Sequence, residues 1–247
     1  MGGTIMAWFF TDSEIGSENF IITGENARHI SKSLRMKPTE TLTLVTPEKE
    51  QLDCVITAVN SDSVEVDITS RKPCENEPDV QITLYQALPK GDKMEYIVQK
   101  CVELGISRIV PVISARCISR PDKKSLAKKQ VRWQKIAKEA AQQSRRGIIP
   151  KIDAAVSFKE AVKLCAQNEQ NIIFYELGGE SVKTLIKNKP ESVGIFIGSE
   201  GGFEQAEVDL ATESGAKAAT LGKRILRAET APLAALSVIM YETGNFE

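Results

Sequence analysis

Histidine is almost absent from this sequence, since the only one is His29. Hydrolases with a serine–histidine site and enzymes with a histidine-bound metal need histidine beside their reacting groups, so both classes are disfavoured. The five cysteines are far apart and include no C-x-x-C pair. They indicate neither a disulfide framework nor a zinc site, so we expect them in the core and expect no metal.

Long apolar runs are also missing. No stretch approaches the roughly 20 apolar residues that cross a bilayer. The opening residues, MGGTIMAWFFTDSE, lack the basic segment, apolar segment and cleavage site of a secretion signal. We therefore expect a cytoplasmic protein with no membrane partner.

The G-x-G-x-x-G fingerprint and the G-x-x-x-x-G-K-[ST] phosphate loop are missing too, which disfavours a dinucleotide-dependent oxidoreductase.

Charge is distributed unevenly, although the formal net charge is only -1. Residues 1–70 carry 5 Lys/Arg against 11 Asp/Glu, whereas residues 90–146 carry 15 against 5. Clustered cations attract the phosphates of nucleic acids. The run KKSLAKKQVRWQKIAKEA also has helical spacing, and taken alone it favours a solvated helix face.

Two kinds of pattern divide the chain. Residues 40–70 alternate short β-rich runs with turn-prone residues, which predicts a small antiparallel barrel. The segment RKPCENEPDV follows, and we place the domain boundary there, giving domains 1–72 and 73–247. From residue 80 onward strands alternate with helices, which predicts an α/β domain with a mainly parallel sheet. In the first of these helices, Met94, Ile97, Val98, Cys101 and Val102 form one apolar stripe, which ends at Gly105.

Glycine-rich turns follow three of the predicted strands: LGGE at 177–180, IGSEGGF at 197–203 and LGKR at 221–224. Glycine lets backbone amides approach a ligand, and ligands of open α/β sheets lie at the carboxyl ends of the strands. The three turns could line one pocket. Each turn taken alone is better explained by glycines of ordinary turns and helix C-caps.

Four long motifs carry a resemblance to a known family: QALPKGDKMEYIVQKCVELGISRIVPVISARC (86–117), QQSRRGIIP (142–150), IGSEGGF (197–203) and LGKRILRAETA (221–231). They resemble, in the same order, the motifs of the ribosomal RNA small subunit methyltransferase E family, which belongs to the SPOUT class. The segment ARHISKSLRMK (27–37) resembles that family's N-terminal PUA-like barrel, so the likeness covers the whole chain.

The resemblance implies a reaction and an architecture. S-adenosylmethionine would donate a methyl group to N3 of a uridine in 16S ribosomal RNA, free or in the small subunit. The C-terminal domain would be a SPOUT methyltransferase domain with a trefoil knot, preceded by the PUA-like β-barrel. The chain would form a homodimer through the knot region. A catalytically inactive RNA-binding assembly factor with the same fold stays open as an alternative.

The resemblance also implies site residues. Those expected to bind the cofactor are Leu177, Gly178, Ile197, Gly198, Glu200, Gly201, Gly202, Leu221, Gly222, Ile225 and Leu226. Arg227, Glu229 and Glu200 are the expected catalytic residues, either glutamate serving as proton acceptor or positioning group. An ion pair between Arg227 and Glu229 that fixes the turn is an equally good interpretation.

We expect RNA contacts from arginines that flank the motifs: Arg28, Arg35, Arg116, Arg120, Arg145, Arg146 and Arg224. The lysines at 123, 124, 128 and 129 are expected to be solvated.

Two positions depart from the family pattern. Ser199 replaces a usual proline, which predicts a less rigid loop. Glu204 replaces the usual Ser or Thr before Glu207, which predicts loss of a capping box, whereas Thr230 is expected to cap the last helix.

Overall fold

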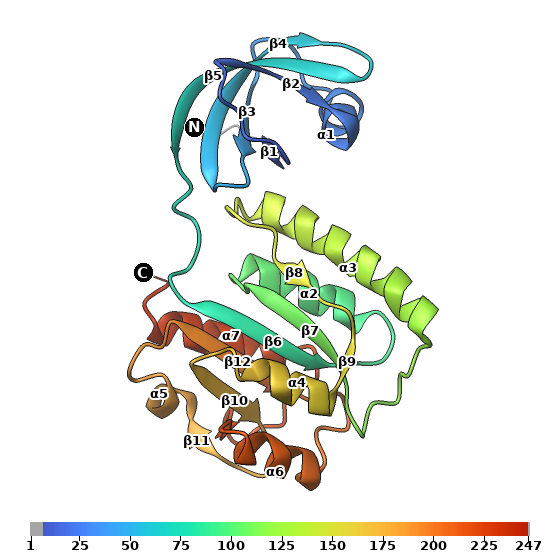
Figure 1. The fold of residues 1–247 in the computed structure, drawn as a ribbon, viewed down its shortest axis with the longest axis vertical. Coiled ribbons are helices and arrows are strands. Elements are labelled where there is room, and N and C mark those ends of the chain that lie inside the picture. The colour runs from blue at the N-terminus through green and yellow to red at the C-terminus, as the bar shows by residue number, and fades with distance from the viewer. Residues whose placement is uncertain (1–6, 247) are drawn as a thin grey trace. The chain divides into compact units, whose positions relative to one another are not determined.

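The computed structural model describes residues 7–246 of the chain (Figure 1). They divide into two compact units. The first comprises the described residues up to Glu77 together with Gln142–Ile148. The second comprises Pro78–Ala141 and the described residues from Ile149 onward.

The first unit is a five-stranded sheet with two short helical segments. Its elements are β1 (Ala7–Phe10), β2 (Asn19–Thr23), α1 (Gly24–Arg28), the π-helix η1 (His29–Leu34), β3 (Thr41–Val45), β4 (Glu50–Val59) and β5 (Ser63–Pro73). The strand order is β1-β3-β4-β5-β2. The antiparallel run of β3, β4 and β5 agrees with the sequence pattern, whereas β1 pairs with β3 in parallel. Because β1 and β2 do not pair with each other, the described sheet is open, and a closed PUA-like barrel stays a prediction.

Alternation of apolar residues builds the core of this unit. Leu52, Cys54 and Ile56 of β4 and Val64 and Val66 of β5 are all buried. Successive side chains of a strand point to opposite faces, so residues two apart share the core face. The period-two pattern in the sequence is therefore sufficient to place this core.

The second unit alternates strands and helices. Its strands are β6 (Gln81–Ala87), β7 (Arg108–Ile113), β8 (Lys151–Ile152), β9 (Val156–Ser157), β10 (Gln170–Phe174), β11 (Glu180–Ser181), β12 (Ser192–Ile197) and β13 (Lys217–Thr220). Its helices are α2 (Lys93–Glu103), α3 (Lys123–Gln143), α4 (Phe158–Cys165), α5 (Val182–Leu185), α6 (Gln205–Glu213) and α7 (Ala231–Glu242). The last two residues of α3 belong to the first unit.

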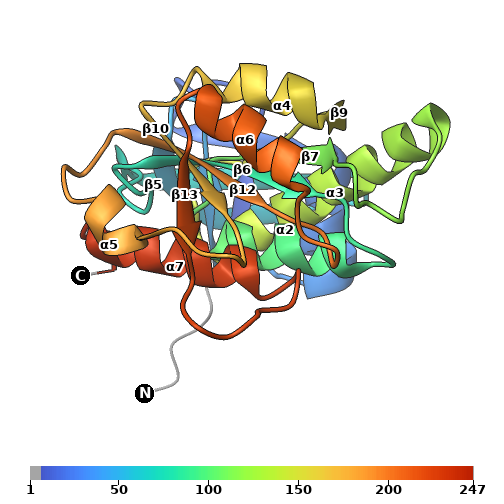
Figure 2. The ribbon, with the colours of Figure 1, turned by 90° about the horizontal axis from the view of Figure 1, so that it is seen from below.

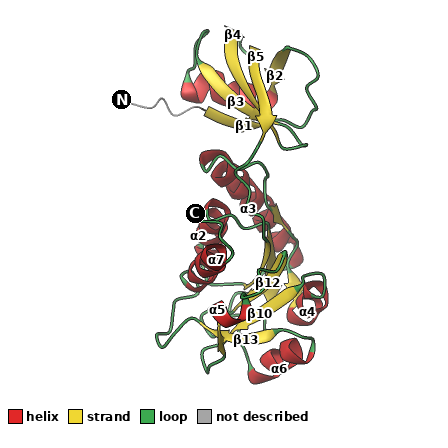
Figure 3. Cartoon of the chain, turned by 90° about the vertical axis from the view of Figure 1, so that its left-hand side faces the viewer, coloured by secondary structure: helices red, strands yellow, loops and turns green. Residues whose placement is uncertain are grey.

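The sheet of the second unit has the order β11-β13-β10-β12-β6-β7-β8, and β9 also pairs with β7. All these pairs are parallel, as the alternation of strands and helices predicts. Helices α4 and α6 cover one face, and α2, α5 and α7 cover the other (Figures 2 and 3). A sheet covered on both faces requires strands that are apolar throughout, and β12 is buried from Val193 to Ile197.

The predicted helix stripe is confirmed, since Met94, Ile97, Val98, Cys101 and Val102 are all buried in α2. Gly105, with a φ of 96°, follows the end of this helix. The five cysteines are free, and all but Cys74 are buried, as expected of core residues. Within residues 7–246, no helix is both long and apolar enough to cross a membrane.

Topology brings one set of loops together. Strands β13, β10, β12 and β6 are neighbours in the sheet and run in the same direction. The loops that follow them therefore meet at one edge of the sheet, where α/β proteins bind their ligands. These loops contain the motif residues 198–203 and 221–230 and the motif segment 88–92.

Candidate active site

A pocket of about 490 Å³ lies at this edge. Its volume falls within the range of small-molecule sites. Nine of the eleven residues predicted to bind a cofactor line it: Ile197, Gly198, Glu200, Gly201, Gly202, Leu221, Gly222, Ile225 and Leu226. The other two do not line it; the Leu177 residue is 77% exposed, and Gly178 adjoins it in the loop after β10.

The loop after β12 folds back on itself at its glycines. Gly202 has a φ of 66°, and its N–H donates to the Ser199 carbonyl over 2.9 Å. A side chain at Gly198 would place its Cβ 2.9 Å from the Cα of Gly202. The two ends of the turn are thus close together, and the residues 198–202 all line the pocket.

One lysine joins three segments of the site. The Lys93 ammonium, in the first turn of α2, lies 3.0 Å from Oε1 of Glu200 and 3.0 Å from Oε2 of Glu229. The backbone N–H of Lys90 also donates to Glu200 over 3.1 Å. The loops after β6, β12 and β13 are therefore connected by the two ion pairs of Lys93 and by the charge-assisted hydrogen bond from Lys90 to Glu200.

The same contacts set the charge of the carboxylates. The pKa of Glu200 lies below its usual value of 4.5, because hydrogen bonds from its own N–H, Lys93 and Lys90 outweigh the opposing effect of burial. The pKa of Glu229 is lowered by its own N–H, by Lys93 and by the charge of Arg227. The Lys93 pKa is raised by Glu200 and then by Glu229. All three groups are ionised at neutral pH.

Acid should therefore weaken this part of the fold. Because the folded-state pKa values of both glutamates are lowered, their stabilising effect is complete above about pH 4.5 and is lost as the pH falls through the lowered values. We expect the free energy of unfolding to decrease on acidification, and to decrease less steeply in Glu229→Gln. Urea unfolding over a pH series measures both slopes, and equal slopes would contradict the pairing.

Lys93, rather than Arg227, is the close ion-pair partner of Glu229. The interpretation of Arg227 and Glu229 as a turn-fixing pair is thus replaced by one in which the turn is fixed to α2. Arg224 and Arg227 both line the pocket and both are exposed. Ile225 between them is 88% exposed. This loop presents cations and an apolar side chain to solvent at the pocket.

Two further arginines lie beside the pocket loop. Arg116 donates from Nη1 to the Gly201 carbonyl over 3.1 Å. Arg120 donates to the carbonyls of Ala115 and Cys117, so it supports its own loop. Both residues are exposed, and the loop that carries them follows β7.

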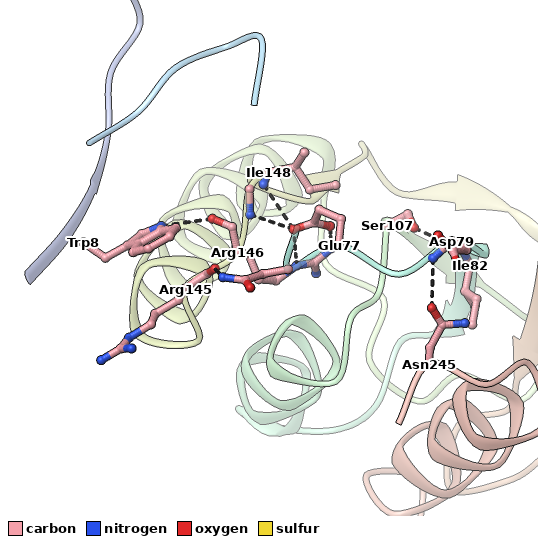
Figure 4. A network of polar contacts seen from close by, with 11 residues as sticks. Trp8, Glu77, Asp79, Ile82, Ser107, Arg145, Arg146, Ile148 and Asn245 are labelled. Atoms are coloured by element: carbon pink, nitrogen blue, oxygen red, sulfur yellow. Dashed lines mark hydrogen bonds and ion pairs between the residues drawn. The ribbon is translucent and has the colours of Figure 1, made fainter. Parts of the chain in front are cut away.

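The remaining arginines predicted to contact RNA lie in the first unit, and they differ in burial. Arg28, Arg35 and Arg145 are exposed. Arg146 is buried, and its Nη2 lies 2.6 Å from Oε2 of Glu77 (Figure 4). A guanidinium that is buried and paired with a carboxylate is not placed to contact phosphate. In this structure Arg146 holds a turn together, which corrects our expectation for this residue.

Sequence reasoning missed several pocket residues, of which Lys93, Glu176 and Lys223 carry charge. Lys93 stands in the quoted motif PKGDKM, where its place at the start of a helix after a central strand was the available signal. Glu176 follows β10, and its carboxylate oxygens would lie 2.8 and 2.9 Å from a Cβ added to Gly202. This carboxylate therefore faces the glycine turn.

The departures from the family pattern have structural consequences. Ser199 is buried, and its hydroxyl donates to the Arg116 carbonyl over 3.4 Å, a bond that proline could not make. At α6 the Glu204 N–H donates to the Glu207 carboxylate over 3.0 Å, which is one half of a capping box. The Glu207 N–H donates to the backbone carbonyl of Glu204 over 3.0 Å, and the Glu204 side chain makes no capping bond, so the half that a Ser or Thr would supply is lost. Thr230 is the N-cap residue of α7 but makes no side-chain capping bond.

No group of three or more His, Cys, Asp or Glu within residues 7–246 is arranged to hold a metal ion.

The family model described as an RNA methyltransferase domain matches residues 75–240. A Bacillus subtilis (strain 168) protein named ribosomal RNA small subunit methyltransferase E is 34% identical over 231 residues, which cover 91% of this chain and 90% of the relative. This chain belongs to the ribosomal RNA small subunit methyltransferase E family.

Solved structures are similar along nearly the whole chain. A ribosomal RNA small subunit methyltransferase E from Neisseria gonorrhoeae, bound to S-adenosyl methionine, has a TM-score of 0.86 and 32% identity, covering 96% of this chain and 97% of that one. A Legionella pneumophila protein in complex with the same cofactor has a TM-score of 0.88 and 31% identity, covering 96% and 98%. The resemblance inferred from the four motifs is thus confirmed at the level of the family.

Proposed function

We propose that this protein transfers a methyl group from S-adenosylmethionine to N3 of a uridine in 16S ribosomal RNA. The observation that carries the proposal is the pocket at the carboxyl ends of β10, β12 and β13, lined by residues of two of the four family motifs, 197–203 and 221–231. The names of the relatives and the cofactor in the two similar structures support it.

The pocket fits the cofactor by size and by donor set. Backbone groups of the turns at 198–202 and 221–222 are available to an adenine and a ribose, and Ile197, Ile225 and Leu226 supply apolar walls. Carboxylates at Glu176 and Glu200 face or line the pocket, which suits a ligand that carries a sulfonium and an ammonium. When bound, S-adenosylmethionine supplies an electrophilic methyl group.

The work of this chain is alignment and charge stabilisation, since transfer from a sulfonium needs no protein nucleophile. Uridine N3 carries a proton, which passes to solvent water before or during attack. Arg227 and Arg224, exposed at the pocket, stabilise the uridine anion that then forms and hold the adjoining phosphates. We assign Arg227 the catalytic role.

Glu200 and Glu229 act as positioning residues in this scheme. An effective general base has a pKa near the working pH. Both glutamates have lowered pKa values, with Lys93 paired to each. They are therefore weak proton acceptors that fix the loops on which Gly201, Gly202 and Arg227 stand.

We further propose the architecture implied by the family: a trefoil knot in the domain 73–247, a PUA-like RNA-binding domain in 1–72, and a homodimer acting in the cytoplasm. Supporting the knot, the chain leaves β13, makes the pocket loop and returns as α7 to pack against β6, β12 and α2. The exposed residues Val238 and Tyr241 of α7 support a dimer through this helix.

Methylation of 16S rRNA tests the reaction. We expect rRNA from a strain that lacks this gene to lose one N3-methyluridine by mass spectrometry, and the wild-type chain to restore it. The inactive assembly factor predicts unchanged rRNA modification and no heat on titration with S-adenosylmethionine. Unchanged modification would therefore reject the proposed function.

A further inference from the structure

The first unit contains a cavity of its own, of about 280 Å³. It is lined by Trp8, Thr43, Gln51, Asp53, Lys72, Asn76 and Arg145. The lining combines an indole, amides, a hydroxyl and three charged groups, and Lys72, Asn76 and Arg145 among them are exposed, so the cavity opens to solvent.

A rigid turn presents Arg145 to this cavity. Its neighbour Arg146 has a side chain that is 3% exposed and pairs with Glu77. The same carboxylate accepts the N–H of Gly147 over 2.8 Å and that of Ile148 over 3.3 Å. A Cβ on Gly147 would lie 2.9 Å from the Cys74 sulfur, so the turn packs closely against Cys74. Glu77 thereby fixes the turn from inside.

Arg145 itself is held in an unusual backbone conformation. Its φ is 57°, a left-handed value that residues other than glycine rarely adopt. The Asn76 amide donates to its carbonyl over 2.7 Å. The side chain is exposed and extends away from the pair of Arg146 and Glu77 (Figure 4). Of the two adjacent arginines, Arg146 is buried in an ion pair with Glu77, whereas Arg145 is exposed to solvent.

Trp8 forms an apolar wall in a fixed orientation. It is 8% exposed, and its indole N–H donates to the Arg146 carbonyl over 3.0 Å. The bond links the ring to the turn that presents Arg145. An aromatic wall and a cation are thus held by the same buried contacts.

The opposite side of the cavity is polar. The Asp53 carboxylate accepts hydrogen bonds from Gln51 over 2.9 Å and from Thr43 over 3.2 Å. The Lys72 ammonium lies 3.7 Å from the same carboxylate and is largely exposed. The lining therefore carries two cations and one anion, with amide groups beside them.

We propose that this cavity binds one unpaired nucleotide of the RNA substrate, with the base against Trp8 and the polar wall, and the phosphate at Lys72 and Arg145. Unpaired bases bind to proteins through aromatic contact together with hydrogen bonds to their edges, and phosphates bind to Arg and Lys. A free phosphate would leave the indole unused and face Asp53. The inference rests on the proposed function, since it assumes an RNA substrate.

Single substitutions test the phosphate contacts. Arg145→Ala and Lys72→Ala should each weaken binding of 16S rRNA about fivefold or more and reduce the slope of log affinity against log salt by about one. Lys128→Ala is the matched control, because it removes one exposed charge from α3, and we expect it to bind as the wild type does. Arg146→Ala is unsuitable as a test, because it would remove the guanidinium that pairs with the half-buried Glu77 and would disturb the turn itself.

Tryptophan fluorescence tests the base contact. The chain has two tryptophans, so Trp133→Phe leaves Trp8 as the only one. We expect a single-stranded oligouridylate to change the emission of Trp8 in this variant, and to do so far more weakly after Arg145→Ala. Emission that stays constant at saturating oligonucleotide would overturn the placement of the base.

The outcomes separate this inference from the function on which it rests. If the wild type methylates 16S rRNA and both Arg145→Ala and Lys72→Ala bind it like Lys128→Ala, the cavity proposal fails alone. If no methyl group is transferred but the Trp8 response and the salt slopes are as expected, the cavity binds RNA and the methyltransferase function fails.

Discussion

Replacing Lys93 with methionine should reduce kcat/KM for methyl transfer about 100-fold. The substitution leaves Glu200 and Glu229 without their common cation, so two carboxylates face each other across the pocket loops. The loops after β12 and β13 then separate, and small displacements of aligned groups reduce rates by about this factor. Lys93→Arg should restore part of the rate, because it keeps the charge.

Lys90→Ala is the matched control for Lys93→Met. Lys90 is exposed and lies three residues away, and its contact with Glu200 is made by the backbone N–H, which alanine keeps. Radiolabelled methyl transfer to 16S rRNA measures all three variants. A rate for Lys93→Met equal to that of Lys90→Ala would show that the three loops do not depend on this lysine.

Gly198→Ala should weaken binding of S-adenosylmethionine at least tenfold. The added Cβ would lie 2.9 Å from the Cα of Gly202 and 3.0 Å from its carbonyl carbon, so the backbone of the turn must open. Overpacking of this kind costs about 1–3 kcal/mol, and 1.4 kcal/mol corresponds to a factor of ten. Because the contact is with backbone rather than with a flexible side chain, no rotamer change relieves it.

Gly16→Ala provides the control for this substitution. Neither Gly16 nor Gly198 has a positive φ, and a Cβ on Gly16 would meet nothing within 4 Å. Calorimetric titration with S-adenosylmethionine compares the two, and we expect Gly16→Ala to bind as tightly as the wild type. Wild-type affinity in Gly198→Ala would mean that the turn at 198–202 is not part of the cofactor site.

Local patterns in the sequence were sufficient for the longer elements of the second unit, but not for the two-residue strands β8, β9 and β11. The apolar stripe of α2, the buried run of β12 and the glycines after strands each depend on neighbours in the chain, which is why they could be read directly. The convergence of the loops on one edge followed from parallel strands. The parallel pairing of β1 with β3 had no local signal, because nothing in a four-residue strand specifies its direction.

Contacts between distant residues could not be predicted in the same way. Lys93 is separated from Glu200 and Glu229 by more than 100 positions, and only the order of strands brings them together. Arg145 and Arg146 look equivalent in sequence, but Arg146 is buried in an ion pair with Glu77, whereas Arg145 is exposed. The contacts of Glu77 with Arg146, Gly147 and Ile148 also explain why Gln142–Ile148 belongs to the first unit although α3 leads into it.

A crystal structure of the chain with S-adenosylmethionine tests the central claim most directly. We expect electron density for the adenosine between the turn at 198–202 and the loop at 221–226, and for the methyl group on the side of Arg227. Density at another edge of the sheet, or a pocket that stays empty at saturating cofactor, would contradict the account.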